Sequence, residues 1–208
     1  MNTFMTYVVL GISLSAPIGP INAAQLDRGA RFGFMHAWLV GLGAMCADVV
    51  YMLLIYFGLA HFLDTPFVKT FLWTFGCFVL IYTGIETLNN LKVPPETPSG
   101  QPLSGANSFR SGFMMALMNP LNILFWLGIY GSILASSMQS SGMLSILLHS
   151  LGIFAGILLW DVVMATLASS FHRFAGPKTL RFISASAAVC LLGFGAYFGY
   201  KAYIQLFG

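Results

Sequence analysis

This chain has very few charged residues. Asp, Glu, Lys and Arg make up 7% of its 208 residues, whereas hydrophobic residues make up 58%. A water-soluble domain carries about 25% charged residues, so this chain could not cover a water-facing surface. The composition therefore predicts an all-α integral membrane protein, surrounded by lipid and built almost wholly from spanning helices. The net charge of +3 comes without any basic run, which argues against a nucleic-acid partner.

Paired cysteines and enzyme motifs are also missing. Cys46, Cys77 and Cys190 are widely spaced in apolar segments, without a C-x-x-C pair, and we interpret them as small buried hydrophobes. The chain has no nucleophile elbow, P-loop or dinucleotide fingerprint. It is therefore predicted to be neither an enzyme nor an ATP-driven pump, and to need no cofactor. No His–Asp or Cys–Asp pair has the spacing of metal ligands on one helix face, so no metal site is expected.

Long apolar runs fill most of the chain. They predict about six transmembrane helices of roughly 20 or more residues each. Alternation with a period of two is weak and the runs are too long for barrel strands, so helices are favoured. The predicted spans cover residues 4–26, 33–60, 67–91, 109–137, 143–170 and 178–205.

A polar segment divides these spans into two halves. Residues 92–108 are rich in Pro, Gly and Ser, which predicts a cytoplasmic linker between residues 1–91 and residues 109–208. Each half then holds three spans. Because three is an odd number, the second half enters the membrane from the opposite side, and we expect two inverted three-helix repeats.

Short motifs recur in the two halves. Ile18-Gly19-Pro20-Ile21-Asn22 has an echo in Asn119-Pro120-Leu121-Asn122. Asp48-Val49-Val50 likewise has an echo in Asp161-Val162-Val163. The spacing between the two motifs differs between the halves, so this alignment of the repeats needs a gap.

The distribution of Lys and Arg predicts the orientation in the membrane. Cytoplasmic loops carry an excess of these residues. An outside N-terminus and an outside C-terminus place Lys69 and Lys201 outside. That arrangement places a larger set in the cytoplasmic loops: Arg28, Arg31, Lys92, Arg110, Arg173, Lys178 and Arg181.

The prolines predict broken helices within the membrane. A proline removes one N–H and displaces the carbonyl four residues earlier, and freed groups of this kind must face protein or a water-filled cavity. For Pro17 we favour a packing kink. For Pro20 and Pro120, each followed two residues later by an Asn, we favour a substrate site over a kink. The half-helix that follows such a break presents free N–H groups to a carboxylate. The freed carbonyls and the side-chain oxygens of Asn22 and Asn122 suit an ammonium group.

Two aspartates lie within predicted spans. Asp48 is close to the middle of the second span, and Asp161 lies beyond the middle of the fifth. A charge at such depth costs at least ~2.5–3.5 kcal/mol. A cap on broken backbone or an anchor between helices is the structural alternative, but no Lys or Arg lies deep in a span to pair with either residue. Burial without a cation favours the protonated acid, so we expect both to exchange protons or to act as counter-ions of a basic substrate.

The motifs resemble those of a known family of transporters. Residues 16–25, followed by Gly29, Gly33 and Asp48-Val49-Val50, resemble the LysE-type amino-acid exporters. This family includes the lysine/arginine and the homoserine/threonine efflux proteins. Two further groups of residues are similar to its patterns in the third and fourth spans: Gly76, Leu80, Tyr82 and Gly84; and Phe109, Gly112, Asn119-Pro120 and Ile123-Leu124-Phe125.

The resemblance implies both an activity and a site. It implies proton-coupled export of an amino acid or a related small zwitterion across the bacterial cytoplasmic membrane, by a homodimer. The residues that carry the family pattern are Gly19, Pro20, Asn22, Asp48, Asn119 and Pro120, and Asp161 joins them as the repeat-related carboxylate. The first motif is similar to the lysine/arginine branch, whereas the stretch after Asn119-Pro120 is similar to the homoserine/threonine branch. Neither branch is therefore assigned.

Two other functions compete with amino-acid export by alternating access. A divalent-metal exporter of the same architecture would use the two membrane carboxylates, although the lack of a His/Asp or Cys/Asp cluster argues against it. A structural or assembly subunit of a larger membrane complex would need no transport site.

Overall fold

The computed structural model describes residues 3–17, 19–58, 66–90, 104–119, 122–123, 126–130, 142–174 and 176–207. These residues are almost entirely helical, and no strand occurs among them, so the prediction of an all-α protein is confirmed for this part of the chain. The helices are α1 (Thr3–Ser15), α2 (Pro20–Phe32), α3 (Phe34–Tyr56), α5 (Pro66–Asn90), α6 (Gly105–Leu117), the π-helix η1 (Trp126–Tyr130), α9 (Gly142–Phe174) and α10 (Pro177–Phe207).

Four helices are each long and apolar enough to cross a membrane. The spans lie in α3, α5, α9 and α10, at Phe34–Tyr56, Thr70–Asn89, Leu144–Phe171 and Lys178–Phe207. They correspond to the second, third, fifth and sixth spans predicted from the sequence. The chain is therefore a multi-pass membrane protein, with four spans in the described residues, or five when a bent pair of helices counts as one.

The first predicted span, residues 4–26, is not one continuous helix. It is divided into α1 and α2, whose axes are bent by 79° at a break before Pro20. The break lies where the sequence predicted it, because Pro20 is the first residue of α2 and has no N–H to continue the ladder of α1. Helix α2 then extends to Phe32, beyond the predicted end of the span.

The fourth predicted span, residues 109–137, is also interrupted. Helix α6 ends at Leu117 and is followed by a turn at Met118 and, further on, by η1. Pro120 and residues 131–137 lie outside the described residues. Helix α6 begins at Gly105, where the Ser104 Oγ accepts a hydrogen bond from the Ala106 N–H at 3.3 Å, so the end of the predicted linker belongs to this helix.

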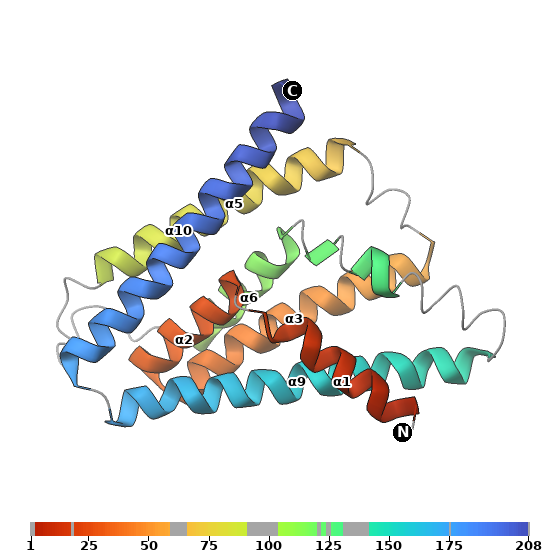
Figure 1. Cartoon of the computed structure of the whole chain (residues 1–208), viewed down its shortest axis with the longest axis horizontal. Helices are drawn as coiled ribbons and strands as arrows, with labels where there is room; N and C mark the ends of the chain where they lie inside the picture. Colours follow the sequence, from red (N-terminus) through yellow and green to blue (C-terminus); the bar gives the residue numbers. More distant parts are fainter. Residues whose placement is uncertain are drawn as a thin grey trace.

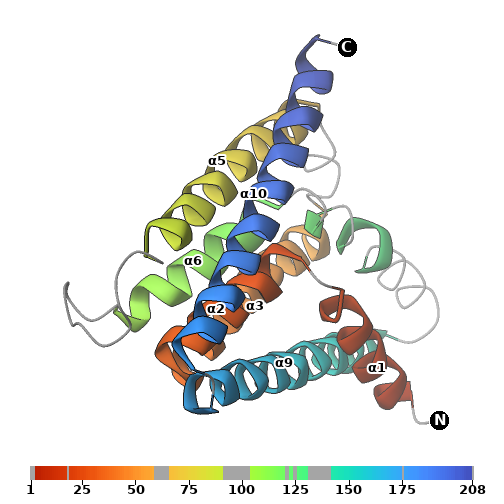
Figure 2. The ribbon, with the colours of Figure 1, turned by 60° about the vertical axis from the view of Figure 1, so that its left-hand side comes forward.

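The helices form three layers (Figures 1 and 2). Helices α5 and α10 lie side by side in one outer layer, and α1 lies against α9 in the other. Helices α2, α3 and α6 fill the layer between them, with α3 packed along α6 and α2 in contact with α3, α9 and α10. The short helix α2 is therefore held on several sides by the long helices.

The close helix contacts of the two halves match one another. Gly11 of α1 lies against the backbone carbonyl of Ile153 in α9, and Gly112 of α6 lies against that of Val40 in α3. In both cases a Cβ would collide with the backbone of the facing helix.

The reciprocal contacts match as well. Gly156 of α9 faces the backbone of Val8 and Ile12, whereas Gly43 of α3 faces that of Phe109 and Phe113. In these contacts each residue of α1 corresponds to a residue of α6 at one constant offset in sequence number. Each residue of α3 likewise corresponds to a residue of α9 at a second constant offset. Each short helix thus packs on the long helix of the other half.

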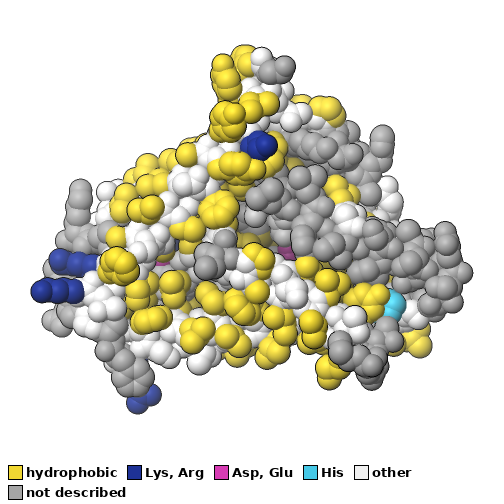
Figure 3. Space-filling view, viewed as in Figure 1, with side chains coloured by type: hydrophobic (Ala, Val, Ile, Leu, Met, Phe, Trp, Pro, Cys, Tyr) yellow, Lys and Arg dark blue, Asp and Glu magenta, His cyan; other side chains and the backbone are white. Residues whose placement is uncertain are grey.

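The outer surface is mainly apolar. Among the side chains that Figure 3 colours by type, hydrophobic ones predominate, whereas Lys and Arg gather mainly near the end where α9 gives way to α10. Large exposed hydrophobic residues occur along α5, α9 and α10. A surface of this kind suits lipid, whose chains offer no hydrogen bonds.

Candidate functional site

The break between α1 and α2 forms one wall of the site. Gly19 precedes α2 in an extended conformation (φ −141°, ψ −173°), and no side chain caps this end of the helix. Pro20 has no N–H, and the Ala23 N–H donates to the Gly19 carbonyl at 3.0 Å. The N–H groups of Ile21 and Asn22 therefore remain without a carbonyl partner inside the helix. They form the partly positive end of the helix dipole.

Asn22 holds this break together. Its Nδ2 donates to the carbonyls of Ser15 at 2.9 Å and Pro17 at 2.8 Å, and its Oδ1 accepts from the Trp160 Nε1 at 3.2 Å. The sequence suggested the Asn22 oxygen as a ligand for an ammonium group. In the structure this oxygen accepts a hydrogen bond from the indole of α9, so Asn22 ties the break of the first half to a long helix of the second, and its contact with a substrate stays a prediction.

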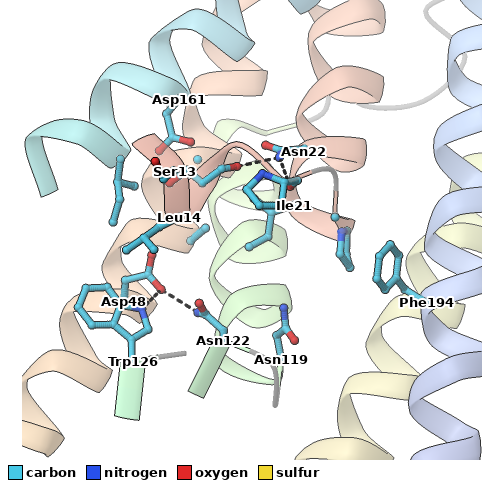
Figure 4. A pocket seen from close by; sticks show the side chains of 17 residues that line it. Ser13, Leu14, Ile21, Asn22, Asp48, Asn119, Asn122, Trp126, Asp161 and Phe194 are labelled. Atoms are coloured by element: carbon cyan, nitrogen blue, oxygen red, sulfur yellow. Dashed lines mark hydrogen bonds between the residues drawn. The ribbon is translucent and has the colours of Figure 1, made fainter. Parts of the chain in front are cut away.

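Asp48 faces the interrupted segment of the second half. Its Oδ1 accepts hydrogen bonds from the Asn122 Nδ2 at 2.7 Å and from the Trp126 Nε1 at 2.9 Å (Figure 4). The Asn122 Nδ2 also lies 3.4 Å from the Ala116 carbonyl at the end of α6. Asn122 thus corresponds to Asn22 of the first half, because each side chain donates to carbonyl groups at the end of the helix that precedes the break.

Asp161 has a different neighbour. Its Oδ1 accepts from the Gln25 Nε2 at 2.9 Å, and the Gln25 side chain is fully buried. Within the described residues, Asp161 Oδ2 and Gln25 Oε1 are buried without a hydrogen-bond partner. Gly41 of α3 makes room for the pair, because a Cβ there would collide with both side chains.

One cavity of about 390 Å³ is lined by Asn22, Asp48, Asn122, Trp126 and Asp161. Apolar side chains from α1, α2, α9 and α10, namely Leu14, Ile21, Ile157 and Phe194, complete its lining (Figure 4). No Lys, Arg or His is among the described residues that line it. The cavity brings together the predicted site residues Gly19, Pro20, Asn22, Asp48, Asn119, Asn122 and Asp161. The remaining predicted site residue, Pro120, lies outside the described residues.

Sequence reasoning missed several residues of the site. Gln25 follows Asn22 by one helical turn and so shares its face, which was the available signal, but it carries no charge to draw attention. Trp126 and Phe194 were indistinguishable from the many other aromatic residues of the chain. Trp160 adjoins Asp161 in the sequence, and the structure places its indole N–H on Asn22.

The cavity offers complementary groups to a small dipolar molecule. The N-terminal end of α2 supplies N–H groups that suit an anion, and two carboxylates supply acceptors for a cation. The described residues contain no group of three or more His, Cys, Asp or Glu side chains that could hold a metal ion.

A separate cluster of charged residues lies at the other end of α2. Arg28 is only 4% exposed and pairs with Glu86 of α5, with 3.3 Å between Nη2 and Oε2. Asp27 is also buried, beside Ser184 of α10. Arg28 was expected from the sequence to lie in a loop, whereas it lies within α2 and links that helix to α5.

Comparisons with known proteins identify the family. The model of the LysE type translocator family matches residues 12–202 of the chain. The chain belongs to the LysE type translocator family. The resemblance found in its motifs is thereby confirmed, and the membrane spans agree with it.

The names of two relatives describe functions. The chain is 57% identical over 210 aligned residues to the Bacillus subtilis (strain 168) protein "Putative amino acid efflux protein YcgF", and the match covers 100% of both chains. It is 30% identical over 194 residues to the Pseudomonas aeruginosa "Chemotactic transduction protein ChpE", with 91% of this chain and 94% of that protein covered. No solved structure matches the chain.

Proposed function

We propose that this LysE-family translocator exports an amino acid or a related small zwitterion from the cytoplasm. The observation that carries the proposal is a cavity in which a half-helix N-terminus faces two carboxylates, with no basic residue among the described residues of its lining. The 57% identical relative, whose name describes amino acid efflux, supports the same substrate class.

The cavity suggests how a zwitterion would bind. The substrate carboxylate would accept hydrogen bonds from the N–H groups of Ile21 and Asn22 at the start of α2. The substrate ammonium group would lie toward the carboxylates of Asp48 and Asp161. A side chain would then contact the apolar residues Leu14 and Phe194. Gly19 and Pro20 shape the first wall, and Asn119, Pro120 and Asn122 are assigned to the second.

Alternating access would come from the two halves moving against each other. The halves are residues 1–91 and 109–208, joined by the linker at 92–108 and related as inverted repeats. The matched contacts of α1 with α9 and of α6 with α3 support this relation. In such a transporter one set of helices rocks around a central site. We propose that the cavity carboxylates couple transport to the proton motive force, because they are the ionisable groups that face the substrate.

The proposed setting is the bacterial cytoplasmic membrane, with both termini outside and the protein a homodimer. The excess of Lys and Arg assigned to one side supports this orientation. Attachment of a membrane-impermeant thiol reagent to single cysteines placed at Gly176 and at Lys201 would test it. Labelling in intact cells is expected at position 201 and not at position 176, and the reverse pattern would contradict the orientation.

An efflux screen tests the function. Cells that express the protein are loaded with amino acids by dipeptide feeding, and every amino acid in the medium is quantified. Wild-type cells are expected to release one or a few amino acids in excess, and Asp48→Asn should abolish the excess at equal membrane expression. Glu96→Gln, which removes a carboxylate in the predicted linker, is the matched control. A flat amino-acid profile would contradict the proposal, and a lowered cellular metal content would then favour a divalent-metal exporter.

A further inference from the structure

We propose that the two cavity carboxylates have different tasks: Asp161, positioned by Gln25, carries the coupling proton, whereas Asp48 stays ionised as counter-ion of the substrate ammonium group. This inference rests on the proposed function and refines it, because the sequence treats the two aspartates as equivalent members of a repeat. Their hydrogen-bond partners differ in a way that distinguishes the two protonation states.

Asp48 is surrounded by groups that stabilise a negative charge. Two N–H groups, from Asn122 and Trp126, converge on its Oδ1 at 2.7 and 2.9 Å. The indole can only donate, and contact with the Ala116 carbonyl turns the Asn122 nitrogen toward Asp48. Hydrogen bonds donated to a carboxylate favour its ionised form. Asp48 also lines the cavity, so its carboxylate is placed to meet a cation there.

The ionised Asp161 and Gln25 together have one hydrogen-bond donor fewer than their buried oxygens require. Asp161 Oδ1 accepts from the Gln25 Nε2, but Asp161 Oδ2 and Gln25 Oε1 are both buried acceptors without a donor in the described structure. Turning the amide over does not help, because it would place the Gln25 oxygen against the carboxylate. A proton on Asp161 Oδ2 supplies the missing donor, which can serve Gln25 Oε1. In this arrangement one proton would satisfy both buried oxygens, which the ionised acid leaves without a donor in the described residues.

Among the described residues that face Asp161, no cation is placed to stabilise its ionised form. Helix α9 packs against α1, α2 and α3. Helix α1 has no charged residue. The charged residues of α2 form the distant cluster in which Arg28 pairs with Glu86. Helix α3 contributes Asp48, whose negative charge opposes a second one at Asp161. Two carboxylates near each other do not readily ionise together, so the proton falls to the one with fewer donors.

The position of Gln25 links the proton to the substrate. Gln25 lies on α2, one turn after the free N–H groups of Ile21 and Asn22. Loss of the proton from Asp161 removes one of the two interactions that would hold Gln25 and so loosens α2, whose start forms the anion end of the site. Proton release and a change in the substrate site are thereby joined through a single short helix.

The test separates exchange from proton-driven transport in proteoliposomes that contain the purified full-length protein. The probe is a ¹⁴C-labelled mixture of the common L-amino acids. One assay measures exchange of labelled for unlabelled mixture without a pH gradient, and the other measures accumulation driven by a pH gradient. Asp161→Asn imitates the protonated acid, because its amide can both accept from and donate to Gln25. We expect this variant to retain exchange and lose pH-driven accumulation, and Asp48→Asn to lose both activities.

The outcomes distinguish the two proposals. If wild-type protein shows neither activity, the proposed function is wrong and the inference fails with it. If wild-type protein is active and Asp161→Asn still accumulates the mixture with the pH gradient, only the assignment of the proton to Asp161 is overturned. Loss of exchange in a folded Asp161→Asn variant together with retained exchange in Asp48→Asn would overturn the division of tasks.

Infrared difference spectroscopy supplies a readout that needs no substrate. A pH titration of the wild-type protein is expected to show the C=O band of a protonated carboxyl group. The band should persist in Asp48→Asn and change frequency in Gln25→Leu, which removes both hydrogen-bonding groups of the amide. A structural role of Gln25 alone would leave the band unmoved. Absence of the band from the wild-type titration, or its loss in Asp48→Asn, would overturn the proposal even if Asp161→Asn does not fold.

Discussion

The indole N–H of Trp160 donates to the side-chain oxygen of Asn22 at 3.2 Å and so joins α9 to the break between α1 and α2. The amide nitrogen of the same Asn22 satisfies the carbonyls of Ser15 and Pro17. One side chain therefore supports the broken backbone and connects it to the other half of the chain. This relationship makes Asn22 as much a part of the scaffold as of the cavity lining.

Replacement of Asn22 by Ala should destabilise the protein. The variant leaves two carbonyls and one indole N–H without partners, at about 1–3 kcal/mol for each such group that stays buried. The expected result is a lower unfolding temperature in detergent, measured by intrinsic fluorescence. Asn107→Ala, at an exposed position in α6, is the matched control and should leave the unfolding temperature nearly unchanged. Equal unfolding temperatures for Asn22→Ala and wild type would contradict the structural role of Asn22.

Replacement of Trp126 by Phe should weaken substrate binding. Phenylalanine retains an aromatic ring next to Phe154 but removes the N–H that Asp48 accepts. A hydrogen bond to a charged group contributes about 1.5–3 kcal/mol, so binding that depends on an ionised Asp48 should fall by roughly tenfold to a hundredfold. The concentration dependence of amino-acid exchange in proteoliposomes measures this effect. Trp73→Phe, which alters an indole packed against Phe198 away from the cavity, is the control, and an equal loss in both variants would refute the specific role.

Replacement of Gly112 by Ala should separate α6 from α3. The added Cβ would meet the backbone carbonyl of Val40, which cannot rotate away as a side chain could. Overpacking of this kind costs about 1–3 kcal/mol, and thermal unfolding in detergent measures it. At Gly193 in α10 a Cβ would meet nothing within 4 Å. Gly193→Ala should therefore be neutral or should stabilise the helix by up to about 1 kcal/mol, and a larger loss there than at Gly112 would contradict the packing.

Replacement of Arg28 by Met should destabilise the contact between α2 and α5. Removal of one partner from a fully buried ion pair costs about 3–5 kcal/mol. A smaller loss is expected here, because the Glu86 side chain is 35% exposed and water screens the pair. Arg181→Met, at an exposed position of α10, is the matched control for loss of a positive charge. Thermal unfolding should rank Arg28→Met below Arg181→Met, and the opposite order would show that the pair does not contribute.

Much of the helical framework could be predicted from the sequence because the thickness and apolar character of the bilayer limit which segments can span it. A helix that crosses the membrane must be long and apolar, so α3, α5, α9 and α10 stand out in the sequence at nearly their observed positions. The interrupted segments were harder to predict. The break at Pro20 was predicted from the proline, but the 79° angle between α1 and α2 and the extension of α2 to Phe32 were not.

The residues of the candidate site could likewise be predicted only in part. Asp48 and Asp161 could be recognised from the sequence because a carboxylate in an apolar segment is costly and seldom present without a reason. Asn22 and Asn122 could be recognised from the prolines before them. Gln25 could not, since an uncharged amide in a short helix gives little sign of its partner.

The sequence by itself determined that this chain is a helical membrane protein of the LysE type, with polar residues at two breaks and in two long helices. Length, hydropathy and proline position are local properties, and the membrane acts on each segment separately. Only the tertiary structure decided that Asp48 meets Asn122 and Trp126 whereas Asp161 meets Gln25. These partners lie far apart in the chain and come together through helix packing at glycines such as Gly43 and Gly112, where backbones approach closely enough to place one half against the other.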